Sequence, residues 1–246
     1  MNVVLIDTAE ISADGTATLT DARAVHLRHV LRVAPGSEVR IGRIDGPLGR
    51  GTVAAVEGQA VTLACAFDDA PPPRPRVDLL LAVPRPKVLR RLWAPLASLG
   101  VGRIVLTNAE KVERDYFDSH VMAPEGFRPL LLEGLQQAKD THVPLVTVHK
   151  RFRVLVEDEL DALCPASRRL VAHPGAASPI REAAADLSPD ARVLVAIGPE
   201  GGWNDFELGL LDEHGFARVS MGERTLTTTT ACVAVLTLVH DALARR

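Results

Sequence analysis

The sequence is poor in cysteine and in long apolar runs. Its three cysteines stand far apart among 246 residues, without a Cys-x-x-Cys pair or the Cys/His spacing of a metal site. We therefore expect Cys65, Cys164 and Cys232 to be reduced thiols, and we expect no metal. No apolar run approaches the ~18–20 residues that span a bilayer, and the first residues do not read as a signal peptide. A cytoplasmic protein without a membrane partner is predicted.

Several fingerprints of common enzyme classes are also missing. The chain has no Gly-x-x-x-x-Gly-Lys-Ser/Thr loop and no Gly-x-Gly-x-x-Gly turn, which disfavours an ATPase or a dehydrogenase. It has neither the Gly-x-Ser-x-Gly turn of serine hydrolases nor a His-Glu-x-x-His pair.

The net charge of −3 conceals an uneven distribution of basic residues. Residues 23–50 hold six arginines against two acidic residues, and residues 74–91 hold six basic residues against one. This concentration of positive charge in the first third of the chain favours a surface that binds the phosphates of a nucleic acid. Solvated surface charge without a ligand is the alternative interpretation.

Residues 1–70 read as a small β-rich module of the barrel or sandwich type, because short apolar stretches alternate with glycine turns. A helix is expected over 21–30, and strands are expected over 3–6, 17–19, 38–41, 51–56 and 60–66. Residues 71–76, Pro-Pro-Pro-Arg-Pro-Arg, are predicted to be an extended linker between two domains.

Residues 77–246 alternate between strand and helix patterns, which predicts an α/β domain with a mostly parallel sheet. The expected strands cover 77–83, 103–107, 144–149, 169–172, 193–197 and 217–221, and helices are expected up to 99, over 124–139, over 204–214 and over 229–243. The last helix is apolar nearly all round, so it is expected to be buried in the core or against a second subunit.

The stretch around residues 193–202 reads as a buried strand that ends in a glycine loop. Behind the loop, Asn204 and Glu207 have the spacing of a capping box. Ligands of open α/β sheets bind beyond the carboxyl ends of the strands, so this loop and those after 169–172 and 217–221 are expected to converge on one pocket. A tight structural turn is the alternative interpretation of the glycines.

With these motifs the chain resembles the RsmE family of ribosomal RNA uridine N3-methyltransferases, of the SPOUT class, as a divergent member. The resemblance rests on Ala196–Gly202, on Gly215-Phe216 and on Met221-Gly222-x-Arg224-x-Leu226. Residues 26–32 followed by Pro35-Gly36, residues 99–104, and Gln137 seven residues before Pro144 agree with it. The resemblance covers nearly the whole chain.

The resemblance implies a trefoil-knotted SPOUT domain over 77–246, a PUA-like RNA-binding domain over 1–70, a homodimer, and S-adenosylmethionine as cofactor. Main-chain groups of the three loops are expected to hold the cofactor, since glycines expose backbone N–H and C=O. The implied cofactor residues are Ala172, His173, Gly175, Ile197, Gly198, Glu200, Gly201, Gly202, Met221, Gly222 and Leu226.

Arg224 and Glu200 are the candidate catalytic residues. Arg224 is chosen as the cation that stabilises the uridine anion, and Glu200 as the group that orients donors in its loop. A carboxylate that stabilises a helix N-terminus is the alternative role for Glu200, and His173 is expected to be structural. Ribosomal RNA of the small subunit is the expected partner, held by His26, Arg28, Arg32, Arg43, Arg85 and Lys87.

The chain departs from the family pattern on the expected substrate side. Threonines at 227–230 replace an arginine and a glutamate, Asp140 stands where arginine is usual, and residues 95–98 lack the expected charged run. A catalytically weak or silent RNA-binding or ribosome-assembly paralogue is therefore one alternative function. A small-molecule methyltransferase is the other.

Overall fold

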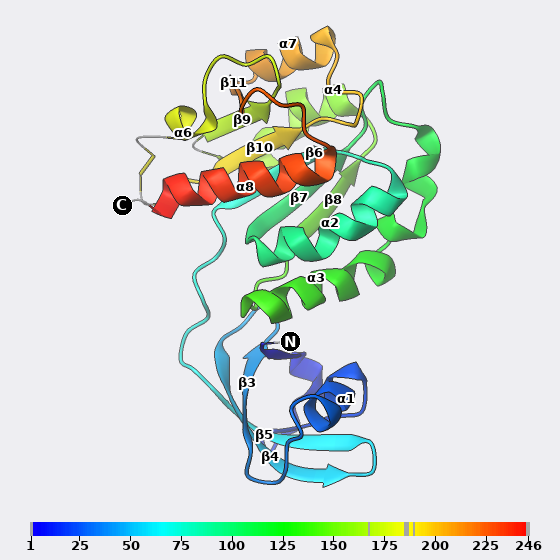
Figure 1. The fold of residues 1–246 in the computed structure, drawn as a ribbon, viewed down its shortest axis with the longest axis vertical. Coiled ribbons are helices and arrows are strands. Elements are labelled where there is room, and N and C mark those ends of the chain that lie inside the picture. The colour runs from blue at the N-terminus through cyan, green and yellow to red at the C-terminus, as the bar shows by residue number, and fades with distance from the viewer. Residues whose placement is uncertain (1, 167, 185–186, 189, 245–246) are drawn as a thin grey trace. The chain divides into compact units, whose positions relative to one another are not determined.

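The structure is a computed structural model that describes residues 2–166, 168–184, 187–188 and 190–244 (Figure 1). It divides into two compact units. Unit 1 contains Met1–Arg74 and Leu132–Val143, and unit 2 contains Pro75–Leu131 and Pro144–Arg246. The first boundary falls inside the proline-rich stretch 71–76, where prolines interrupt regular hydrogen bonding.

Residues 132–143 belong to unit 1 because their backbone bonds to it. The N–H groups of Asn2 and Val3 donate to Gln136 O at 3.0 and 3.1 Å. The Asp45 N–H donates to Thr141 O at 2.8 Å, and Thr141 Oγ1 donates to Gly46 O at 2.6 Å. The predicted domains, 1–70 and 77–246, did not include these contacts, since they join residues between 95 and 134 positions apart.

Unit 1 contains, among its described residues, a five-stranded sheet in the order β1-β3-β4-β5-β2. The strands are β1 (Val4–Ile6), β2 (Thr16–Leu19), β3 (Glu38–Arg43), β4 (Leu48–Glu57) and β5 (Ala60–Phe67). β1 runs parallel to β3, and the other pairs are antiparallel. Helix α1 (Ala22–His29) inserts Ala24 and Leu27 into a core shared with the sheet. Each strand and the helix predicted for this region is confirmed, with β4 longer at both ends.

Arg23 is a structural residue of unit 1. It forms ion pairs with Glu10 and Asp21, and its Nη1 donates to Leu5 O at 2.6 Å. The hydrogen bond from Arg23 holds the pKa of Glu10 below its usual value. Of the six arginines in residues 23–50, Arg23 therefore stabilises the fold and does not add to a phosphate-binding surface.

Unit 2 is built, in its described part, on a six-stranded parallel sheet in the order β11-β9-β10-β6-β7-β8. The strands are β6 (Val77–Ala82), β7 (Val101–Thr107), β8 (Leu145–His149), β9 (Arg168–Ala172), β10 (Val193–Ile197) and β11 (Phe216–Val219). Every residue of β6 and β10 is buried, as their continuous apolar runs predict. The predicted parallel α/β architecture is confirmed.

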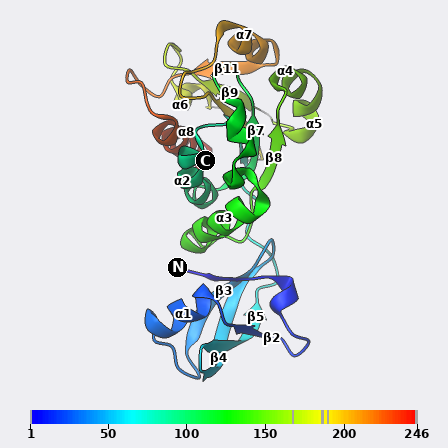
Figure 2. The same ribbon diagram turned by 90° about the vertical axis from the view of Figure 1, so that its right-hand side faces the viewer.

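Helices cover both faces of this sheet. The longer ones are α2 (Pro86–Ser98), α7 (Asp205–Glu213) and α8 (Thr228–Ala244), and the short ones are α4 (Phe152–Val154), α5 (Leu160–Leu163) and α6 (Ile180–Ala183). Helix α3 (Pro124–Ala138) begins in unit 2 and ends in unit 1. Figures 1 and 2 show α2 and α8 on one face and α4 and α5 on the other. The sequence prediction missed α4, α5, the π-helical turn Leu155–Glu159 between them, and α6.

The three cysteines are free thiols, as predicted. Burial raises the pKa of Cys164 to about 11 and that of Cys232 to about 12, and it also raises the pKa of the half-buried Cys65. Since the thiolate is the reactive form, these side chains act as small apolar groups.

The start of α7 confirms the predicted capping box. Glu207 N–H donates to Asn204 Oδ1 and Asn204 N–H donates to Glu207 Oε2, both at 2.8 Å. Replacing Asn204 with alanine is expected to lower the free energy of unfolding by about 1 kcal/mol, because one helix N–H loses its acceptor. Urea denaturation measures this loss. Asn204→Asp, which keeps an acceptor, should remain within about 0.3 kcal/mol of wild type.

Candidate functional site

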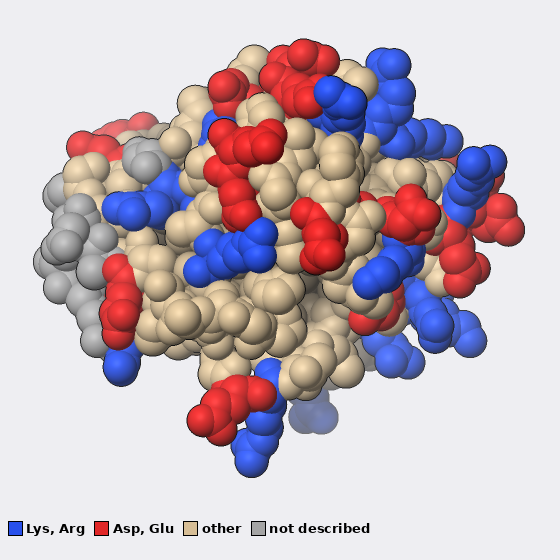
Figure 3. Space-filling view, turned by 90° about the horizontal axis from the view of Figure 1, so that it is seen from above, with Lys and Arg blue, Asp and Glu red and all other residues tan. Residues whose placement is uncertain are grey.

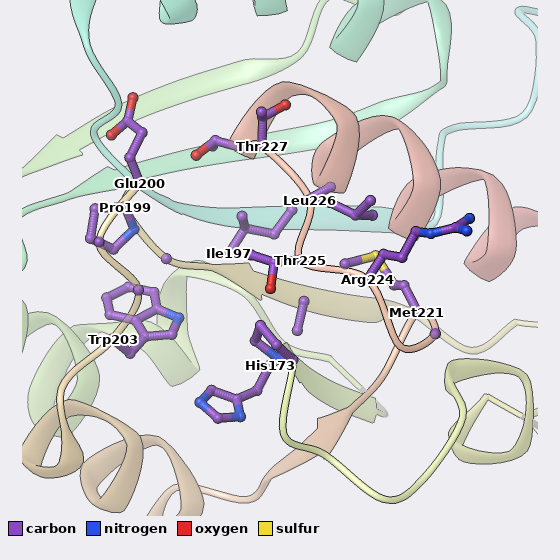
Figure 4. Close-up of a pocket in the computed structure, with 18 residues that line it drawn as sticks. His173, Ile197, Pro199, Glu200, Trp203, Met221, Arg224, Thr225, Leu226 and Thr227 are labelled. Carbon is purple, nitrogen blue, oxygen red and sulfur yellow. The ribbon is translucent and has the colours of Figure 1, made fainter.

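A cavity of about 570 Å³ lies where β9, β10 and β11 end (Figure 4). The loops that follow these strands form most of it, and the first turn of α8 completes it. Its lining residues are Ala172, His173, Pro174, Ile197, Gly198, Pro199, Glu200, Gly201, Gly202, Trp203, Met221, Gly222, Arg224, Thr225, Leu226, Thr227, Thr228 and Ala231. The expectation that three loops converge at this edge of the sheet is confirmed.

The residues predicted to hold a cofactor line this cavity, with Gly175 as the exception. Gly175 follows Pro174, and its N–H donates to His173 Nδ1 at 3.1 Å. It therefore shapes the first loop without contributing to the wall. That these residues bind a cofactor stays a prediction.

Backbone hydrogen bonds join the first loop to the third. His173 N–H donates to Val219 O at 3.0 Å, Ser220 N–H donates to Ser178 O at 2.8 Å, and Ile180 N–H donates to Ser220 O at 3.1 Å. These bonds continue the pairing of β9 with β11 past the strand ends. The two loops are thus held together by the main chain, whatever their side chains.

The second loop is a tight turn fastened from outside. Gly202 N–H donates to Pro199 O at 2.8 Å, and Gly202 has φ of 71°, a conformation that favours glycine. Lys111 Nζ donates to Gly201 O at 2.7 Å. A Cβ on Gly201 would lie 2.6 Å from Lys111 Cδ, so the missing side chain makes room for this lysine.

Glu200 is tied to the start of another helix. Its Oε1 accepts the N–H of Arg85, the residue before α2, at 3.1 Å. A carboxylate at a helix N-terminus interacts favourably with the helix dipole. The alternative role considered for Glu200 thus fits the contacts, although the helix is α2 and not the one that follows the glycine loop.

Arg224 lies on the other side of the lining from Glu200. Figure 4 shows the two side chains extending away from each other and from the middle of the group. Arg224 is exposed. The two predicted catalytic residues are therefore not brought together, and the separate roles predicted for them stay predictions.

Thr227 precedes helix α8 and caps its first turn, a role that the sequence did not predict. Its Oγ1 accepts the N–H of Thr230 at 3.4 Å and lies 3.0 Å from Thr230 Oγ1. Its carbonyl accepts the N–H of Ala231 at 2.8 Å. Threonine is a favourable residue at such a position. Thr227, which stands where the family pattern has its second arginine, thus has a structural role at the edge of the cavity.

Trp203 is the largest lining residue that the sequence prediction missed. It is 6 % exposed, and its ring packs against Phe152 with 5.2 Å between the centroids. Phe152 belongs to α4, which was itself not predicted. The signal was present only as an apolar residue directly after Gly201-Gly202.

The candidate RNA-binding residues lie in both units. In unit 1, His26 and Arg28 are half-buried on α1, and Arg32 is exposed just beyond this helix. The Arg43 guanidinium lies 5.9 Å from the centroid of the Phe67 ring. In unit 2, Arg85 and Lys87 are exposed at the start of α2. Figure 3 shows basic and acidic side chains interspersed on the face seen from above, so that face favours neither sign of ligand. RNA binding by these residues stays a prediction.

Asp140, the other departure from the family pattern, has local partners. Its Oδ1 accepts the backbone N–H groups of Thr141 and His142 at 2.6 and 3.1 Å. The carboxylate thus shapes the turn that follows α3. Within the described residues, no group of His, Cys, Asp and Glu could hold a metal ion, and no helix is long and apolar enough to cross a membrane.

Comparisons with known proteins agree on one family. Residues 71–240 match the family model of the RNA methyltransferase domain. Ribosomal RNA small subunit methyltransferase E of Treponema pallidum is 32% identical over 98% of this chain and 92% of its own length. The same enzyme of Neisseria gonorrhoeae, solved bound to S-adenosyl methionine, has a TM-score of 0.75 at 20% identity, covering 98% of this chain and 97% of its own. A probable rRNA-methyltransferase structure from Porphyromonas gingivalis has a TM-score of 0.76 at 22% identity, with 98% of each chain covered.

Proposed function

Since this chain belongs to the ribosomal RNA small subunit methyltransferase E family, we propose that it transfers a methyl group from S-adenosylmethionine to ribosomal RNA. The observation that carries the proposal is the cavity formed by the three loops after β9, β10 and β11. Its volume of about 570 Å³ suits one small-molecule ligand. The family match over residues 71–240 covers every residue of its lining.

The lining fits a cofactor that is held mainly by the main chain. Gly198, Gly201, Gly202 and Gly222 line the cavity without side chains, so a ligand can approach their main chain closely. Some of their polar groups already have partners, since Gly202 N–H donates to Pro199 O and Gly201 O accepts from Lys111. Met221 and Leu226 supply apolar surface. When bound, S-adenosylmethionine supplies an electrophilic methyl group. The loops would fix its orientation, and orientation contributes much of the rate of such a transfer.

The proposed target atom is N3 of a uridine in the small-subunit RNA. Methylation there removes the N3 proton, so a nearby cation would stabilise the developing anion. Arg224 remains the proposed cation, because it is the one arginine or lysine among the described residues that line the cavity. Glu200 is proposed to hold the second loop against Arg85 and thereby position the cofactor, without touching the proton.

Two measurements test the function. Calorimetry with S-adenosylmethionine should detect binding, and mass spectrometry of ribosomal RNA should find 3-methyluridine in cells with the protein and not in cells without it. A silent paralogue would bind no cofactor at millimolar concentration. A small-molecule methyltransferase would lack the steep fall of RNA affinity with salt that phosphate contacts produce.

We also propose a trefoil knot in unit 2, a PUA-like RNA-binding role for unit 1, a homodimer and a cytoplasmic location. The likeness to solved family structures over 98% of the chain supports the topology. Val233 of α8, 39 % exposed, supports a partner subunit on that helix. Light scattering that gives the monomer mass of 26.4 kDa would contradict the dimer.

A further inference from the structure

Trp203 presents a hydrogen-bond donor that has no acceptor in the described part of the chain. Its Nε1 is buried and lacks a partner there. Trp203 lines the cavity, and Figure 4 shows the nitrogen edge of its indole turned toward the other lining residues. Indole nitrogen is a donor only, and buried donors in folded proteins nearly always have an acceptor.

Close packing holds the ring in this orientation. Phe152 packs against it with 5.2 Å between the ring centroids. At Gly198, a Cβ would lie 3.1 Å from Trp203 Nε1, Cδ1 and backbone N, so the main chain there is also close to the indole. The donor is thus aimed by packing, before any ligand arrives.

The other tryptophan of the chain has its acceptor within the fold. Trp93 is fully buried in α2, and its Nε1 donates to Val121 O at 3.2 Å. The protein thus provides an acceptor for the indole N–H of Trp93, and its described residues provide none for that of Trp203. A ligand in the cavity is the simplest source of an acceptor for Trp203.

We infer that Trp203 Nε1–H donates a hydrogen bond to the nucleoside half of bound S-adenosylmethionine and so positions it. This inference rests on the proposed function. The donor is uncharged, and Gly198 and Pro199 beside it carry no charge either. Arg224 extends away from Trp203 in Figure 4, so this arginine could not pair with a cofactor carboxylate that lay at the indole. A ribose oxygen or an adenine ring nitrogen is a neutral acceptor that matches this donor.

The first test uses the two indole N–H signals of the ¹⁵N-labelled protein. Saturating S-adenosylmethionine should move the Trp203 indole proton downfield and leave that of Trp93 in place, since Trp93 is bonded already. Trp93→Phe assigns the two signals. A Trp203 signal that moves no more than that of Trp93 at saturation contradicts the inference.

The second test removes the donor and keeps an aromatic ring. Trp203→Phe should weaken binding of S-adenosylmethionine and of 5′-methylthioadenosine, which lacks the amino-acid half, by the same factor of about ten. Trp93→Phe, the matched control, should bind both as wild type does. Circular dichroism verifies that the variants fold.

The outcomes separate this inference from the proposed function. If the wild-type protein binds no S-adenosylmethionine, the function itself fails. If it binds and Trp203→Phe binds equally well, only the role of Trp203 fails. A loss for S-adenosylmethionine without a loss for 5′-methylthioadenosine would place the acceptor outside the nucleoside and contradict the assignment.

Discussion

Replacing Gly198 with valine is expected to weaken binding of S-adenosylmethionine about 100-fold, because overpacking at such a site costs about 2–3 kcal/mol. The new Cβ alone would lie 3.1 Å from the backbone N and the ring of Trp203. Those atoms have little freedom to move, since Phe152 packs against the indole. The two valine methyl groups would add bulk beside the cavity that Gly198 lines. Calorimetric titration measures the loss.

Gly209→Val provides the matched control. Gly209 lies inside α7, and a Cβ there would meet nothing within 4 Å. The same substitution should therefore leave cofactor affinity unchanged, as long as both variants keep the circular dichroism spectrum of the wild type. A Gly198→Val protein that binds within about tenfold of the wild type would show that the glycine loop does not border the ligand.

The fold of unit 2 was predictable where local chemistry decides it. The run Val193–Ile197 is apolar without alternation, and such a run needs burial on both faces, which a central parallel strand provides. Asn204 and Glu207 satisfy backbone groups three residues apart, so their spacing alone predicts the helix start. Phe152–Leu163 has a π-helical turn in its middle, which disturbs the helical period, and its helix was missed.

The sequence predicted which loops form the candidate site, but it did not predict the side-chain contacts that hold these loops. Glycines after parallel strands indicate loops that approach a ligand, and the loops after β9, β10 and β11 do meet around one cavity. The bond from Arg85 to Glu200 joins residues 115 positions apart, and that from Lys111 to Gly201 joins residues 90 apart. Neither residue type nor local spacing in the sequence indicates that residues so far apart along the chain form a hydrogen bond.

The departures from the family pattern at 227–230 affect both the charge beside the cavity and the start of helix α8. Loss of an arginine and a glutamate removes charge beside the cavity, which motivated the alternative of a silent paralogue. In the structure, Thr227 lies just before α8 and accepts the Thr230 N–H, and the first turn of this helix borders the cavity. The substitution therefore preserves the wall that a cofactor would contact. This favours retained cofactor binding, and whether the lost charges alter RNA contacts stays a prediction.

The buried ion pair between Asp78 and Arg192 predicts the largest effect on stability. Asp78 lies on β6 with its side chain 2% exposed, and Arg192 Nη2 donates to both of its carboxylate oxygens at 2.8 Å. Arg192→Met keeps most of the side-chain volume and leaves the buried carboxylate without its cation. Removing one member of such a pair typically costs about 3–5 kcal/mol. We expect about 3 kcal/mol, at the low end, because the Arg192 side chain is 35% exposed and water reaches it.

Two controls distinguish this cost from a general loss of charge. Arg153→Met breaks an exposed pair with Glu157 and should change the free energy of unfolding by at most about 0.5 kcal/mol. Adding Asp78→Asn to Arg192→Met removes the uncompensated charge, so the double variant should regain part of the stability lost by the single one. Urea denaturation of the three variants measures these differences. If Arg192→Met were as stable as Arg153→Met, the carboxylate of Asp78 would have to be solvated or paired by another group, contrary to its burial.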